Sequence, residues 1–254
     1  MDHAFVVMAF GHSPFLEGCL ADLSRQSLRS KIAVVTSTPS ARLEALAARV
    51  GADYFVNGAG GGIGADWNFG LRITGARYVT LVHQDDVYDA RFLEESMNLL
   101  STHGAALSFT GYEEVNAHGK RTNSKLSRVK HLMDAFALGG ARCPPLWRMR
   151  LYLSFGVALP CSSVTYDLSQ LDGFSFATSY EANLDWDAWL RLIRARKVFA
   201  RTSARLVGRR HNDLTATSRA LVSGARRRED QEMFRRIWPR PLADLIAVAY
   251  RTGY

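Results

Sequence analysis

The first half of the chain alternates short apolar runs with stretches whose apolar residues recur at helical spacing. Runs rich in Val, Ile, Phe and Tyr cover residues 4–10, 31–36, 53–56 and 78–82 and predict strands, of which the first is expected to be buried and the third to be short. Ser13-Pro14 and Thr38-Pro39 each offer a cap and a first-turn proline for a helix between these strands. The alternation predicts an α/β fold with a mainly parallel sheet flanked by helices.

The strand predicted over residues 78–82 ends abruptly in polar residues: His83, Gln84, Asp85 and Asp86. Open α/β sheets bind ligands in the crevice at the carboxyl ends of their parallel strands. Adjacent carboxylates repel each other, and they are best tolerated there when a divalent cation lies between them and a phosphate. The pair therefore predicts a metal site. The alternative is that Asp85 or Asp86 caps the helix expected from about Asp89 onward.

The glycine-rich stretch from Gly60 to Ala65 offers a second interpretation. It fits the relaxed dinucleotide-binding pattern G-x-G-x-x-A, with a carboxylate, Asp85, about 20 residues further on. Against this interpretation, the stretch follows the third predicted strand and not the first. A third possibility is that the glycines only make a tight turn.

In the second half, residues 183–192 form the clearest predicted helix. Trp186, Trp189 and other apolar residues share one face, and Asp187 and Arg191 form an i,i+4 pair. Asp185 lies near the N-terminal end, where free amides and the helix dipole stabilise a carboxylate without any function. The functional interpretation is a general base held beside the crevice.

Composition and charge narrow the class of protein. A chain of 254 residues with 47% hydrophobic residues is long enough for one large domain, and disorder is excluded. The net charge of +8 favours polyanionic partners. The basic clusters lack interleaved aromatic residues, so they predict a solvated helical face in preference to a nucleic-acid site; they are residues 201–210, 226–228 and 235–236.

Cysteines and targeting signals suggest a cytoplasmic protein. The three cysteines, Cys19, Cys143 and Cys161, are far apart and predict reduced core thiols without disulfides or zinc. We find no secretory leader pattern, and the apolar run over residues 242–250 is too short to span a membrane.

Several motifs, in this order and spacing, resemble the inverting family-2 glycosyltransferases of the GT-A fold. The resemblance covers most of the chain and is carried by residues 6–10, 62–70, 83–86, 171–174, 184–192 and 210–215. It implies a single GT-A type domain. Residues 1–110 would form the nucleotide-sugar-binding half, 111–215 the acceptor-binding and base-carrying half, and 216–254 a basic helical tail.

The resemblance also implies roles for individual residues. Asp85 would hold Mn²⁺ or Mg²⁺ against the donor's diphosphate together with His211, and Asp185 would be the general base. The residues expected to bind the donor are Ala9, Phe10, Thr36, Asn68, His83, Gln84, Asp86 and Arg210.

Three positions depart from the family pattern. His83 stands where the family has its first acid, so it is expected to contact the ribose or a phosphate. Leu184 replaces a glutamate, and residues 36–38 lack the acid that helps to bind the nucleotide.

The expected function is transfer of a sugar from a nucleotide diphosphate sugar to a hydroxyl of a glycan or lipid-linked saccharide, as in polysaccharide biosynthesis. The alternatives are a dinucleotide-dependent dehydrogenase and a basic nucleic-acid-binding protein. We expect no nucleic-acid partner. Residues 226–236 and the apolar tail leave open a peripheral contact with the inner face of an anionic membrane.

Overall fold

The parallel half of the sheet forms from the predicted apolar runs. The computed structural model describes residues 2–116, 118, 121–122, 125–157, 159–210 and 220–251. Its first strands pair in parallel, in the spatial order β3-β2-β1-β4, and this half ends with the carboxyl ends of all its strands at one edge. The bounds are β1 (His3–Ala9), β2 (Lys31–Thr36), β3 (Asp53–Val56) and β4 (Tyr78–His83).

The second half of the sheet is mixed. β8 lies between β4 and β6 and is antiparallel to both, whereas β9 runs parallel to β6. The order across the sheet is β3-β2-β1-β4-β8-β6-β9-β5, with β7 paired to β6. The bounds are β5 (Val87–Tyr88), β6 (Leu107–Val115), β7 (Arg121–Thr122), β8 (Val164–Asp167) and β9 (Phe199–Arg210). The mainly parallel α/β architecture is therefore confirmed.

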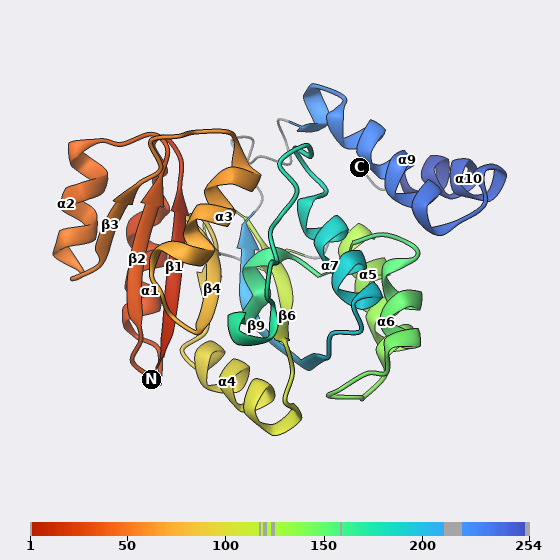
Figure 1. Cartoon of the computed structure of the whole chain (residues 1–254), viewed down its shortest axis with the longest axis horizontal. Helices are drawn as coiled ribbons and strands as arrows, with labels where there is room; N and C mark the ends of the chain where they lie inside the picture. The colour runs from red at the N-terminus through yellow and green to blue at the C-terminus, as the bar shows by residue number, and fades with distance from the viewer. Residues whose placement is uncertain are drawn as a thin grey trace.

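Helices cover both faces of this sheet (Figure 1). Alternate residues of β1 point to opposite faces: Phe5 and Val7 pack with apolar residues of α1, α2 and α4, while Ala4 and Val6 belong to a core that includes α3, α6 and α7. The helices on the first half are α1 (Leu16–Ser24), α2 (Ala41–Arg49), α3 (Ile63–Ile73) and α4 (Phe92–His103). Those that follow are α5 (Lys125–Leu138), α6 (Leu146–Leu153), α7 (Leu184–Arg194), α9 (Ala225–Ile237) and α10 (Arg240–Arg251).

Two helix starts differ from the expectation. α2 begins after Ser40, whose hydroxyl accepts the Leu43 N–H at 3.3 Å, so Thr38 is not its cap. α1 begins at Leu16, because the Ser13 hydroxyl accepts the Phe15 N–H at 3.2 Å in a turn that precedes the helix. In both cases a serine hydroxyl and a nearby amide decide where the chain turns.

Two expectations about the surface are wrong. Residues 201–210 form strand β9 and not a helical face, and Arg201 is buried against β6 with its guanidinium bound to Asp134 at 2.5 Å. Cys143 is exposed, so only Cys19 and Cys161 are core thiols.

The described part of the C-terminal tail packs against α7. Phe234 of α9 meets the Trp186 ring edge-on at 5.0 Å, and Tyr250 of α10 meets Phe234 at 5.4 Å. Arg226 is buried, so the cluster 226–228 is not wholly a solvated face. Within the described residues, no helix is long and apolar enough to cross a membrane.

Candidate active site

The turn after β4 separates its two neighbouring carboxylates. Asp86 is only 2% exposed, its Oδ1 accepts the Arg210 N–H at 3.1 Å, and burial raises its carboxyl pKa despite the opposing charge of His83. Asp85 stays partly exposed. Neither residue caps α4, whose N-cap residue is Arg91. Asp85 is therefore the more accessible carboxylate of the pair, and Asp86 is buried.

His83 closes the inner side of this turn. Its ring stacks on Trp67 with centroids 5.6 Å apart, and its Nδ1 lies 3.7 Å from Asp86 Oδ2. The His83 Nε2 and the Asp86 Oδ2 are buried and have no hydrogen-bond partner among the described residues. Unsatisfied buried polar atoms are costly, and they mark a place that a bound group can complete.

The turn after β4 offers Asp85 to a metal, and the remaining ligands of such a metal would have to come from elsewhere, a bound molecule included. Among the described residues, no group of three or more His, Cys, Asp or Glu side chains can hold a metal by itself, and the predicted ligand His211 lies outside the described residues. Mg²⁺ is commonly bound by one or two carboxylates together with substrate phosphates. Asp85 would supply such a carboxylate, and the Asp86 Oδ2 in the same turn accepts no hydrogen bond from the described residues.

The ends of β1 and β2 form the neighbouring wall. The Gln84 side chain pairs with the Phe10 backbone, where its Oε1 accepts the N–H at 3.2 Å and its Nε2 donates to the carbonyl at 2.9 Å. The Thr36 hydroxyl accepts the Thr38 N–H at 3.0 Å. Ala9 and Thr36 are buried. These predicted donor-binding residues therefore gather at one edge, but the side chains of Gln84 and Thr36 are used to shape the backbone there.

Asn68 ties α3 to the segment that leads toward α7. Its Nδ2 donates to the Phe176 carbonyl at 2.9 Å, and its Oδ1 accepts the Phe176 N–H at 2.7 Å. In the same contact, a Cβ on Gly64 would lie 2.6 Å from the Ala177 carbonyl oxygen. Asn68 thus supports the site through this segment, and Gly64 is needed for the close approach of α3.

Arg210 fixes the turn from the end of β9. Its Nε donates to the Asp85 carbonyl at 2.9 Å, and its Nη1 donates to the Asn116 carbonyl at 2.6 Å. The Cζ atom of its guanidinium lies 4.2 Å from the Phe15 ring centroid.

Arg209, the neighbour of Arg210 in β9, was missed in the sequence. The charge of Arg209 lowers the pKa of Asp86 and of Asp185, so Arg209 lies within electrostatic reach of both carboxyls. The alternation of side chains along a strand was the available signal.

Asp185, in the second half of the chain, lies within electrostatic reach of His83 at the end of β4. It lies in the first turn of α7, where its Oδ1 accepts the Trp186 N–H at 2.7 Å. Burial raises its carboxyl pKa, and Arg226, the Trp186 N–H, Arg209 and His83 oppose that shift in decreasing order. Since His83 acts on Asp185, the fold brings the turn after β4 and the start of α7 together. A carboxyl with a raised pKa is, once ionised, a stronger base than an exposed aspartate.

Comparisons with known proteins support the fold and the family resemblance found in the sequence. The family model described as glycosyl transferase family 2 matches residues 4–153. The fold is similar to that of S. aureus TarS residues 1–349 in complex with UDP-GlcNAc, with a TM-score of 0.68 and 14% identity over 98% of this chain and 71% of that chain. It is also similar to mannosyl-3-phosphoglycerate synthase from Rubrobacter xylanophilus, with a TM-score of 0.56 and 17% identity over 91% and 74% of the two chains. The sequence matches none of the curated proteins with which it was compared.

Proposed function

Because the chain belongs to glycosyl transferase family 2, we propose that it is an inverting enzyme that moves a sugar from a nucleoside diphosphate sugar to a hydroxyl of a glycan or lipid-linked saccharide. The observation that carries this proposal is the position of Asp185, a carboxyl with a raised pKa within electrostatic reach of the turn that holds Asp85. Membership of a glycosyltransferase family sets aside the dehydrogenase and the nucleic-acid-binding protein as functions.

The donor is proposed to bind at the carboxyl ends of β1, β2 and β4. A solved structure of similar fold holds UDP-GlcNAc, which supports a nucleoside diphosphate sugar in this crevice. Asp85 would hold Mn²⁺ or Mg²⁺ there, and the metal would supply charge neutralisation for the departing diphosphate. Arg209 adds a positive charge within electrostatic reach of Asp86 and Asp185.

Asp185 is proposed to act as the general base. It takes the proton of the acceptor hydroxyl while that oxygen attacks the anomeric carbon, and the bond from that carbon to the diphosphate oxygen breaks. A single displacement of this kind inverts the anomeric configuration. A pKa above the usual aspartate range makes the carboxylate a stronger base than an exposed aspartate.

A donor screen tests the proposal. We would measure the melting temperature of the protein with UDP, GDP and dTDP sugars and with NAD, each with and without Mn²⁺, and assign the anomeric configuration of any product by NMR. A shift for one nucleotide sugar that depends on Mn²⁺, with an inverted product, is expected. A rise in melting temperature with NAD alone, unaffected by Mn²⁺, would count against the proposed glycosyltransferase function.

The outer face of α10 supports a second proposal, peripheral contact with an anionic membrane. Leu245 and Val248 are 66% and 59% exposed, and Arg240 and Arg251 lie at the ends of the same helix. Deleting the helix is not a clean test, because Tyr250 packs on the core of α7 and α9. The combination of an apolar stripe and flanking arginines is typical of helices that lie on a membrane surface.

Substituting the stripe tests this contact without opening the core. Leu245→Glu with Val248→Glu is expected to lower co-sedimentation with phosphatidylcholine–phosphatidylglycerol vesicles by about tenfold or more, since it places two charges in the apolar contact. Val222→Glu, at a residue that is exposed away from α10, serves as the control. Equal sedimentation of the double variant and the unmodified protein would contradict the contact.

A further inference from the structure

Three consecutive backbone N–H groups just before α7 bind one carboxylate. Glu181 N donates to Glu229 Oε1 at 2.7 Å, and Ala182 N and Asn183 N donate to its Oε2 at 2.9 Å each. Glu229 belongs to α9 and is only 8% exposed. Hydrogen bonds to an ionised carboxylate are roughly twice as strong as those between neutral groups. This contact therefore holds the two segments firmly together.

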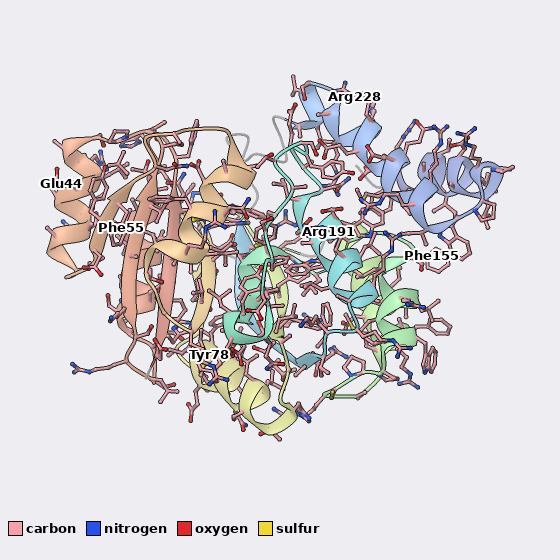
Figure 2. All side chains as sticks on the ribbon, in the orientation of Figure 1. Glu44, Phe55, Tyr78, Phe155, Arg191 and Arg228 are labelled. Carbon is pink, nitrogen blue, oxygen red and sulfur yellow. The ribbon has the colours of Figure 1, made fainter. Side chains whose placement is uncertain are left out.

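The rest of α9 binds the same segment on both sides of Asp185. The Asn183 Nδ2 donates to Asp230 Oδ1 at 2.8 Å on one side. On the other, the guanidinium of Arg236 donates to Asp187 Oδ1 at 2.7 Å, while Arg191, labelled in Figure 2, binds the second oxygen of that carboxylate at 2.8 Å. Every one of these partners is part of α7, of the segment before it, or of α9 (Figure 1).

The start of α7 is held partly by its own side chains, because the Asp185 Oδ1 accepts the Trp186 N–H. Its N-cap residue, Asn183, makes no side-chain hydrogen bond to the first turn. Free amides at a helix start need partners, and the amides that lead into α7 find theirs in Glu229. The orientation of the first turn, and with it of Asp185, thus depends on a residue from a different helix.

We propose that Glu229 is a positioning residue for catalysis, which clamps residues 181–183 so that the carboxyl of Asp185 stays aligned with the acceptor hydroxyl. This inference rests on the proposed function of Asp185. A carboxylate is required because both oxygens accept hydrogen bonds. In Glu229→Gln, one of these oxygens becomes an NH₂ group, which opposes at least one backbone N–H.

The test compares Glu229→Gln with Arg227→Gln, a substitution on the exposed face of the same helix. In Glu229→Gln, we expect amide hydrogen exchange in peptides covering residues 180–187 to be about tenfold faster or more. We expect kcat to fall about 10- to 100-fold with an unchanged donor KM, since small misplacements of a catalytic group have effects of this size. The pH midpoint of kcat is also expected to move, which a loss of stability alone does not cause. Arg227→Gln should match the unmodified protein.

Several outcomes would overturn the clamp. Unchanged exchange in Glu229→Gln would show that the carboxylate does not hold the segment, and unchanged kcat with faster exchange would show that the segment does not position the base. Glu229→Asp keeps both acceptor oxygens on a shorter side chain and should give intermediate values if Glu229→Gln does not fold. The exchange measurement needs no substrate, so it decides the clamp even if no sugar is transferred and the proposed function fails.

Discussion

Asp185→Asn should reduce sugar transfer by about 10²- to 10⁴-fold, the range that general acid–base catalysis commonly contributes. The asparagine keeps an Oδ1 that can accept the Trp186 N–H, so the first turn of α7 is preserved. What it loses is the ability to take a proton from the acceptor. The loss is therefore expected in kcat, with the Mn²⁺-dependent shift of the melting temperature by the donor retained.

The same variant should be at least as stable as the unmodified protein at neutral pH. Burial raises the folded-state pKa of Asp185 above its unfolded value, so the ionised carboxyl opposes folding. The stability that its protonated form contributes is present at low pH and is lost as the pH rises through the folded-state pKa. Replacing the carboxyl of Asp185 with a neutral amide removes this pH-dependent loss of stability. The transfer rate of the unmodified protein should rise with pH through the same raised pKa, because only the carboxylate accepts a proton.

Kinetics and melting curves over a pH series measure both effects. Asp172→Asn, at an exposed residue, is the matched control and should change neither the transfer rate nor the melting temperature. An Asp185→Asn variant that keeps more than about a tenth of the activity would refute the base assignment, since the expected loss is at least 10²-fold.

Asp85→Asn should abolish the Mn²⁺-dependent part of donor binding and lower kcat/KM by about 10²-fold or more. A metal at a phosphoryl oxygen contributes several kcal/mol to the stabilisation of transition-state charge, and about 1.4 kcal/mol corresponds to tenfold in rate. The fold should survive, because the contact that Arg210 Nε makes here is with the Asp85 backbone carbonyl, which the variant retains.

The expected readout is a donor-induced rise in melting temperature that no longer responds to Mn²⁺. EDTA added to the unmodified protein should reproduce that behaviour, whereas Asp53→Asn, at an exposed residue of β3, should not. If Asp85→Asn kept a full response to Mn²⁺, the metal would have to be held elsewhere.

The predictability of the fold differed between strands and helix ends. The bounds of β2 and β3 agree with the predicted strands over residues 31–36 and 53–56, because short runs rich in apolar and β-branched residues favour strands. The starts of α1 and α2 were each displaced by two residues. Several hydroxyls near each start could cap, and the choice between them depends on which amide each one reaches in the folded chain.

The sequence by itself determined the α/β class, the family resemblance, and the residue types of the site: a carboxylate pair after a strand and an aspartate at a helix start. These follow from local periodicity and from motifs that are contiguous in the chain. Only the tertiary structure decided that Asp86 is buried while Asp85 is partly exposed, and that Asn68, Gln84 and Arg210 bind backbone groups. It also decided that Glu229 of α9 binds the amides before Asp185. The physical reason is that desolvation and hydrogen bonding depend on which atoms packing brings together, and those atoms come from segments far apart in the chain.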